Sequence, residues 1–343
     1  MISQETETLY RRQSARFIQW VADQERETPD IWADALQHYA GHLSLKSWRL
    51  YRNALTWHMR ETYGPVETER FLRLTDAGPK PPMKRKRLQR RVDPQVLKIL
   101  LTHLCGMRGS MGRRVADLMV ATIATGIRPS EWQAVTRPDA RRIRVQNAKF
   151  RPNTPLQPGR GNGRVRELVL SERIVGSEVD AAINRTMLWL QEHEWKSVQP
   201  STSRTLKAAL GSLITARQIG EAWRKLRIYD CRHQFSADAK ATLDLFGGEV
   251  AAAMGHGSAM TAIEHYGKRQ HGRSGRTMVR PSQASVQAVR QETLDMVRLT
   301  VKEDAGRRLA NKGREPTKQD RPSLRTGEVS KRPEGSGVAP DHP

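Results

Sequence analysis

Cysteine is scarce in this chain of 343 residues, which contains only Cys105 and Cys231. Two isolated thiols cannot build a disulfide framework or a cysteine-based zinc site, so we expect a reducing compartment and no bound metal. Long apolar runs are also missing, because none approaches the roughly 18–20 residues that span a bilayer. The N-terminal sequence MISQETETLY is polar and unlike a signal peptide. We therefore expect a cytoplasmic protein without a membrane partner.

Acidic side chains are outnumbered, with 36 Asp and Glu against 59 Lys and Arg, which gives a formal net charge of +23. So large a cationic excess favours a polyanionic partner through counterion release and long-range attraction. Nucleic acid is the leading hypothesis. Composition alone leaves open a ribosomal-type protein, a membrane-surface binder and a basic disordered tail. The excess is uneven, because residues 1–80 contain eleven basic and eleven acidic side chains.

Helix signals dominate residues 1–78, where we predict a helical domain of four helices. Thr28-Pro29-Asp30 precedes the pattern IWADALQHYA, and Gly64-Pro65 separates SWRLYRNALTWHMRETY from ETERFLRL. The fourth helix is ETLYRRQSARFIQWVADQ. Residues 79–92 are rich in proline and basic side chains, which prevent a packed helix. We predict that they form a linker to a second domain.

The second predicted domain covers residues 93–275. Asp93-Pro94 starts a helix in QVLKILLTHL, and RRVADLMVATIA has the apolar spacing of a buried helix. IRVQNAK and VRELVL have strand character and flank the Pro/Gly-rich stretch RPNTPLQPGRGNG, which predicts an irregular hairpin. Helical patterns resume from Ser171. The predicted fold class is mainly α with a small antiparallel β-sheet.

Two further segments complete the predicted organisation. Residues 276–310 form a helical tail whose apolar stripe is Val286, Val289, Leu294, Val297 and Val301. The stripe is suited to packing on its own domain or on a neighbouring protomer. Residues 311–343 contain too few apolar side chains to fold, and we expect them to be disordered.

Three islands in the second domain have the residue types that phosphodiester chemistry requires. In ATGIRPSE, Arg128 follows a glycine turn and precedes a proline typical of a helix start, an environment suited to an oxyanion. In YDCRH, Arg232 is predicted to open a helix and to clamp a phosphate with its two-pronged guanidinium. In MGHG, His256 precedes Tyr266 by ten residues, and a short helix from Ser258 to His265 would bring them together. Taken singly, each could be an ordinary surface or structural residue.

The order of these islands resembles the T-G-[IL]-R-x-x-E, H-x-x-R-H and L-G-H…Y boxes of the tyrosine recombinases, the phage-integrase family. The matching residues are Gly126, Arg128, Glu131, Arg232, His233, Gly255, His256 and Tyr266. The resemblance implies an N-terminal helical, SAM-like core-binding domain followed by a tyrosine-recombinase catalytic domain. It also implies a site-specific recombinase or integrase of a mobile genetic element that is associated with the nucleoid.

The resemblance implies roles for individual residues. Arg128 and Arg232 would bind the non-bridging phosphate oxygens, with hydrogen bonds from His256 and Tyr229. Tyr266 would attack and form a 3′-phosphotyrosine. Lys149 would protonate the leaving 5′-oxygen, because it lies on the hairpin where the family has its lysine, with Arg164 and Arg166 on the returning strand.

Glu131 would orient a catalytic side chain, and His233 would bind the phosphate or support the residues that do. No cofactor or metal is implied. The implied partner is double-stranded DNA with inverted-repeat half-sites, which a homotetramer would bind. Accessory DNA-bending proteins could take part in this complex.

One departure from the family pattern is Tyr229, which stands where the second box usually has histidine. A phenol donates hydrogen bonds but exchanges no proton near neutral pH, because its ordinary pKa is about 10. The change leaves room for an inactive DNA-binding regulator with the same fold. A type IB topoisomerase-like enzyme would need the same residue types. A basic RNA-binding protein is disfavoured, because we find no aromatic stacking platform with glycine-rich motifs.

Overall fold

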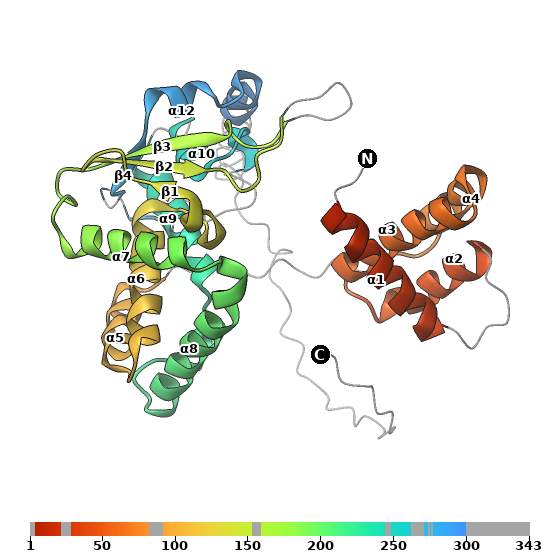
Figure 1. Ribbon diagram of the computed structural model, residues 1–343, viewed down its shortest axis with the longest axis horizontal. Helices are drawn as coiled ribbons and strands as arrows, with labels where there is room; N and C mark the ends of the chain where they lie inside the picture. Colours follow the sequence, from red (N-terminus) through yellow and green to blue (C-terminus); the bar gives the residue numbers. More distant parts are fainter. Residues whose placement is uncertain are drawn as a thin grey trace, which may run out of the picture. The chain divides into compact units, whose positions relative to one another are not determined.

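The computed structural model describes the following residues of the chain: 4–21, 29–81, 92–152, 159–243, 248–261, 271–273, 275 and 277–299. The chain divides into two compact units, Met1–Leu88 and Gln89–Pro343 (Figure 1). No described helix is both long enough and apolar enough to cross a lipid bilayer.

The first unit contains the four predicted helices. They are α1 (Gln4–Val21), α2 (Pro29–His38), α3 (Leu45–Thr62) and α4 (Pro65–Ala77), with a short 3-10 turn, η1 (Tyr39–Gly41). The Ser44 hydroxyl caps α3 by accepting a hydrogen bond of 3.0 Å from the Ser47 amide. Gly64 precedes α4 with a φ of +85°, which glycine adopts without strain.

The core of the first unit consists of large side chains from all four helices. Fully or almost fully buried are Phe17, Trp32, Leu36, Trp48, Leu55, Met59 and Phe71. Burial of several aromatic rings stabilises so small a unit, because each ring removes a large apolar area from water.

The second unit is also mostly helical. Its α-helices are α5 (Pro94–Gly106), α6 (Ser110–Thr125), α7 (Glu178–Glu192), α8 (Trp195–Thr215), α9 (Ile228–Thr242), α10 (Glu249–Met254) and α12 (Gln283–Gln287). Residues 291–299 are helical as well. Two 3-10 helices, η2 (Pro129–Ala134) and η3 (Glu221–Trp223), lie in connections. Asp93 caps α5 as predicted, accepting hydrogen bonds from the amides of Gln95 and Val96.

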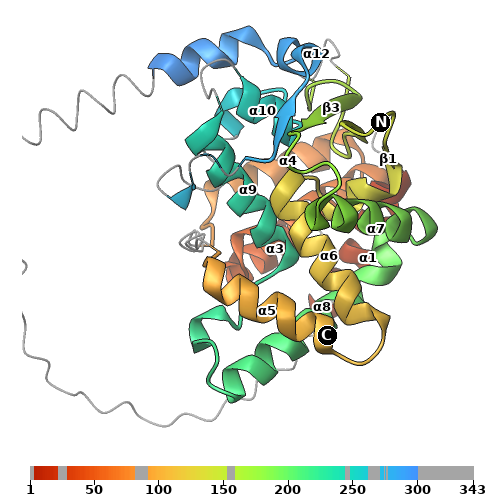
Figure 2. The same cartoon turned by 90° about the vertical axis from the view of Figure 1, so that its left-hand side faces the viewer.

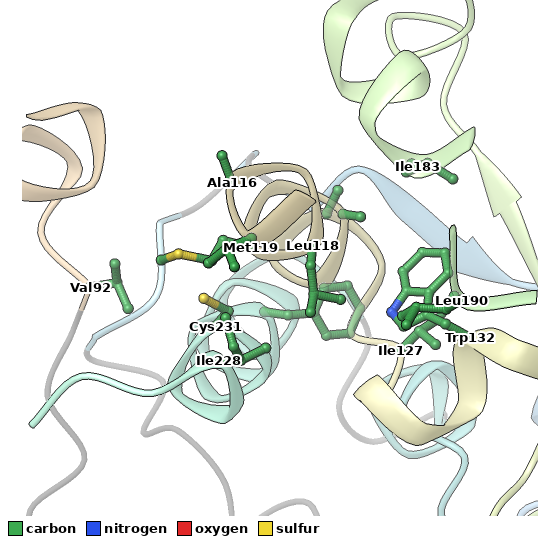
Figure 3. Close-up of a cluster of buried hydrophobic side chains, with 14 of the residues drawn as sticks. Val92, Ala116, Leu118, Met119, Ile127, Trp132, Ile183, Leu190, Ile228 and Cys231 are labelled. Carbon is green, nitrogen blue, oxygen red and sulfur yellow. The ribbon is translucent and has the colours of Figure 1, made fainter. Parts of the chain in front are cut away.

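Helix α6 lies at the centre of this unit and contacts α5, α7, α8 and α9. Figure 3 shows side chains of this core, among them Leu118 and Met119 of α6, Cys231 of α9 and Trp132 of η2. All four are shielded from solvent. The apolar run of α6 therefore forms a buried helix, as its spacing predicts.

A four-stranded antiparallel sheet accompanies the helices, in the order β1 (Val135–Thr136), β2 (Arg142–Gln146), β3 (Val165–Leu170) and β4 (Val279–Pro281). β2 and β3 form the predicted hairpin, with Val145 opposite Arg166. α10 and α12 pack against the sheet (Figures 1 and 2). The predicted fold class, mainly α with a small antiparallel sheet, is confirmed.

The segment expected to be a helical tail, 276–310, contains a strand. β4 pairs with β3 at the edge of the sheet, where a proline is tolerated. This strand was not predicted, because a strand of only three residues that includes a proline shows no alternating pattern in the sequence. The apolar stripe packs on its own unit, since Val289, Leu294 and Val297 cluster with alanines of α10. Val301 and residues 311–343 lie outside the described residues.

Candidate active site

Arg128 is placed by the turn that ends α6. Gly126 closes the helix with a φ of +67°, and a Cβ there would meet the Phe235 ring at 2.2 Å, so only glycine fits. Arg128 then precedes Pro129, the first residue of η2, as the sequence predicts. Its Nη1 donates to Glu131 Oε1 at 2.5 Å, and its backbone amide donates to Oε2 at 3.0 Å. Glu131 therefore fixes both the backbone and the side chain of Arg128.

Glu131 is buried and lies between positive charges. Its Oε2 also accepts a hydrogen bond of 2.8 Å from Arg166 Nη2, and its Oε1 accepts one of 3.3 Å from the Ala148 amide. Burial by itself would raise the pKa of Glu131, but the charges of Arg166, Arg128 and Arg232 together hold the pKa well below its ordinary value. The carboxylate is therefore ionised, and it connects Arg128 to the turn that carries Lys149.

Arg166 occupies the buried face of β3 and has no solvent exposure. Besides Glu131, its guanidinium donates to the carbonyl of Ala253 at 3.2 Å and to Oδ1 of Asn147. One side chain thus joins the sheet, η2 and the end of α10. The sequence predicts Arg166 on the returning strand of the hairpin but does not indicate its structural role. A charge at an inward-facing strand position was the signal that could have revealed it.

Arg232 lies in the second turn of α9, although we predicted that it opens the helix. The helix starts earlier because Asp230 accepts a hydrogen bond of 2.9 Å from the Arg227 amide, which caps it. The Arg232 guanidinium is fully buried and donates to the carbonyls of Gly126 and, at 2.7 Å, Met254. Arg232 thereby ties together all three sequence islands.

His256 follows α10 after Gly255, which has a φ of +70° and lies against Asn147 and Arg166, where a Cβ would clash. The imidazole is 5% exposed. Burial, followed by the charges of Arg232, Arg128 and Arg166, lowers the pKa of His256 well below its ordinary value, against a smaller opposing effect of Glu131. The ring is therefore neutral at pH 7 and can both donate and accept a hydrogen bond.

Of these side chains, Arg128 and His256 line a cleft of about 660 Å³. Five of the side chains in its lining were predicted from the sequence, namely Arg128, Lys149, Tyr229, His233 and His256. The rest of the lining consists of Arg151, Arg160, Ser258, Thr261, Arg290 and several glycines. Five of the lining side chains are Lys or Arg, and among the residues that the structure describes no carboxylate lines it. Such a cleft is suited to bind a phosphate group.

Within the cleft, Lys149 is exposed in the turn after β2. Tyr229 and His233 lie one turn apart on α9, with ring centroids 5.2 Å apart and edge-on. Burial lowers the pKa of His233 to about 4, and nearby arginines and Lys240 add to this effect against Asp230. Arg232 is not among the described residues that line the cleft, so its charge acts from beneath the surface.

No protein-family model matches the sequence, and no curated protein does. Solved structures do resemble the fold. The Tn1549 transposon integrase in complex with transposon right end DNA gives a TM-score of 0.47 at 13% identity, covering 78% of this chain and 96% of that one. The XerH site-specific recombinase bound to palindromic difH substrate gives 0.43 at 16% identity, covering 75% and 74%. One neighbour is thus an integrase and the other a site-specific recombinase, each in complex with DNA.

Tyr266, the nucleophile expected from the sequence motifs, lies outside the described residues. The described chain stops at Thr261, which lines the cleft, and resumes at His271, whose carbonyl accepts a hydrogen bond of 3.2 Å from Gln234 of α9. Of the short helix expected over Ser258–His265, residues 259–261 are helical and the rest is likewise outside the described residues.

Three arginines of the cleft were not singled out from the sequence. Arg151 and Arg160 flank the Pro/Gly-rich part of the hairpin, and Arg290 lies within the segment of the apolar stripe, directly after Val289. Nothing in their local sequence separates them from other surface arginines. Among the described residues, no group of His, Cys, Asp or Glu side chains is arranged to hold a metal ion.

Proposed function

We propose that this protein is a site-specific DNA recombinase that cuts and rejoins DNA through a 3′-phosphotyrosyl intermediate at Tyr266. The observation that carries the proposal is the convergence of Arg128, Lys149 and His256, which come from three separate segments and line one cationic cleft. The chain enters the expected nucleophile segment from Thr261, in the lining of the same cleft.

The cleft supplies what phosphoryl transfer requires, namely stabilisation of negative charge and positioned proton donors. Arg128, held by Glu131, binds a non-bridging phosphate oxygen, and Arg232 adds positive charge from beneath. The phenolic oxygen of Tyr266 forms a bond to phosphorus as the bond to the 5′-oxygen breaks. The neutral His256 accepts the phenolic proton, and Lys149 protonates the leaving oxygen. Attack by a 5′-hydroxyl reverses these steps and rejoins the strand.

The partner in this proposal is double-stranded DNA. Residues 1–78 serve as the core-binding domain, 79–92 as the linker and 93–275 as the catalytic domain, with both domains contacting one inverted-repeat half-site. Because residues 1–80 are neutral overall, the phosphate attraction comes mainly from the second unit and the linker. A homotetramer on two paired sites completes the exchange.

The test uses a supercoiled plasmid that carries the DNA flanking the gene for this chain. We expect a protein–DNA adduct that survives denaturing detergent, with the nucleotide attached to Tyr266 in peptide mass spectrometry. Tyr266→Phe should abolish the adduct, whereas Tyr10→Phe, in α1, should leave it unchanged. A wild-type protein that binds the plasmid without forming an adduct would overturn the proposal in favour of a regulator. Relaxed plasmid without exchanged strands would indicate a topoisomerase.

A further inference from the structure

We propose that Arg151, Arg160 and Arg290 form a second phosphate-binding subsite in the cleft, which holds the phosphodiester next to the reacting one on the same DNA strand. That the ligand is the DNA strand being cut rests on the proposed function. That the three arginines lie in the same cleft as His256 is an observation of the structure and does not depend on that function.

The first observation is a pair of like charges on the hairpin. Arg151 and Arg160 face each other across a bridge in which each backbone amide donates to the other residue's carbonyl, at 3.0 and 2.9 Å. Directly opposite residues of an antiparallel pair have their side chains on the same face, a few ångströms apart. Two guanidinium groups so placed repel each other. An anion bound between them turns that repulsion into attraction.

The hairpin arm that carries this pair is fixed to the rest of the unit. Asn162 is 1% exposed, and its Nδ2 donates to the carbonyls of Ala252 in α10 and Ser285 in α12, both at 3.2 Å. Its Oδ1 accepts a hydrogen bond of 3.0 Å from Asn147. The amide nitrogen of Asn162 therefore holds the arm against two helices, and its amide oxygen joins the arm to the opposite side of the hairpin. The position of Arg160, two residues earlier, is correspondingly defined.

The same arm touches the loop that carries His256. A Cβ on Gly257 would lie 2.2 Å from the carbonyl oxygen of Gly161, so the two backbones are in direct contact. Gly257 follows His256 and Gly161 follows Arg160. The hairpin pair and the imidazole are thus brought together by backbone packing between two segments almost a hundred residues apart in the sequence.

Arg290 reaches the same loop from the C-terminal side. Its backbone amide and its Nε both donate to the carbonyl of Gly257, each at 3.1 Å. The following helix is anchored nearby, since Thr293 Oγ1 accepts a hydrogen bond of 3.1 Å from the Ala259 amide. Gly257 therefore contacts both Gly161, which follows Arg160 in the chain, and Arg290. Nη1 and Nη2 of Arg290 take no part in this anchoring, and within the part of the chain that the structure describes neither has a hydrogen-bond partner.

A nucleic-acid strand is the ligand that fits two adjoining anion sites. Its phosphates repeat at short, regular intervals, with one charge per 3.4 Å of axis on each strand. Arg128 and His256 contact the reacting phosphate, and the three further arginines contact its neighbour. A mononucleotide or inorganic phosphate fills one subsite only, so the second subsite favours a polymeric substrate.

The test measures binding of a fluorescein-labelled 30-base-pair duplex of arbitrary sequence to full-length Tyr266→Phe protein at several NaCl concentrations. Removing contacts to one phosphate should reduce the slope of log affinity against log salt by about 0.9. We expect this reduction for Arg151→Ala/Arg160→Ala/Arg290→Ala. The Arg160→Ala/Arg290→Ala variant changes only exposed side chains, so it should fold normally and show the same direction of change.

The matched control removes the same charge elsewhere, through Arg173→Ala/Arg204→Ala/Arg224→Ala, three exposed positions of the second unit outside the cleft. An equal loss of slope in this control would overturn the subsite, because net charge alone would then explain the result. An unchanged slope in the triple cleft variant would overturn it as well. The readout is independent of covalent chemistry. If the triple cleft variant shows the reduced salt slope but the wild-type protein forms no covalent adduct, the subsite stands and the proposed function fails. If the adduct forms but the slope is unchanged, the proposed function stands and the subsite fails.

Discussion

Glu131 and Arg166 form an ion pair of 2.8 Å in which neither side chain is exposed to solvent. The pair connects η2 to β3, and through Glu131 it also fixes Arg128, which lines the cleft. A buried charge that loses its partner is costly, since desolvation is no longer compensated. The helical part and the sheet of the second unit are therefore coupled through the candidate active site itself.

The first prediction concerns Glu131→Gln, which keeps the shape of the side chain and removes its charge. Arg128 and Arg166 would lose their common counter-ion, and we expect the free energy of unfolding to fall by about 3–5 kcal/mol. Urea denaturation followed by circular dichroism measures the change. Glu172→Gln is the control, because Glu172 forms an exposed pair with Arg141 and should cost at most about 1 kcal/mol. Similar losses in both variants would contradict a special role for the buried pair.

The second prediction concerns acid pH. His233 has its pKa lowered from 6.5 to about 4 by burial, so the folded protein binds fewer protons than the unfolded chain between these values. The contribution of His233 to stability is therefore complete above pH 6.5 and is lost as the pH falls towards 4. The unfolding free energy of the wild type should decline across this window, more steeply than that of His233→Gln. NMR titration of the imidazole should give a midpoint near 4, and a midpoint at 6.5 would refute the shift.

The third prediction uses two glycines with opposite surroundings. Gly257→Ala places a methyl group 2.2 Å from the Gly161 carbonyl, and separating the two backbones should cost about 1–3 kcal/mol. Gly211→Ala, inside α8, meets no atom within 4 Å and should stabilise the protein by up to about 1 kcal/mol, because alanine favours the helix. Thermal unfolding distinguishes the two. A neutral Gly257→Ala would mean that the hairpin and the His256 loop are not in contact.

The fourth prediction is a difference in thiol reactivity. Cys105 is exposed, whereas Cys231 is buried in α9, and burial raises its pKa far above the ordinary range. Since the thiolate is the reactive form, a chromogenic disulfide reagent should label one thiol per native chain quickly and the second only after denaturation. Cys105→Ser should remove the fast phase. Rapid labelling of two thiols in the native protein would show that α9 opens readily.

Local signals in the sequence were sufficient for much of the fold. Asp93 before Pro94 predicts the start of α5, and alternating apolar residues predict the β2–β3 hairpin, because caps and periodicity depend on neighbours only a few positions apart. The convergence of Arg128, Lys149 and His256 on one cleft agrees with the family resemblance. The role of Tyr266 stays a prediction, as do the assigned domain boundaries.

Other parts of the site depend on contacts between distant segments, which local patterns do not encode. The pairing of Glu131 with Arg166 spans 35 positions. The anchoring of Arg290 on Gly257 spans 33. Arg232 was expected to present its guanidinium to a ligand, but its hydrogen bonds go to two backbone carbonyls that only the tertiary fold brings near it. The hydrogen-bond partners of these arginines depend on how distant segments pack together. A sequence motif can therefore identify a functional arginine but cannot predict its contacts.

The position of β4 bears on where the chain can be truncated. Strand β4 and Arg290 both come after the last motif box in the sequence. Nevertheless, β4 is the edge strand that pairs with β3, and Arg290 lines the cleft. A chain that ended between Tyr266 and Val279 would therefore lack the edge strand of the sheet and one cationic side chain of the cleft, although every motif box would be intact.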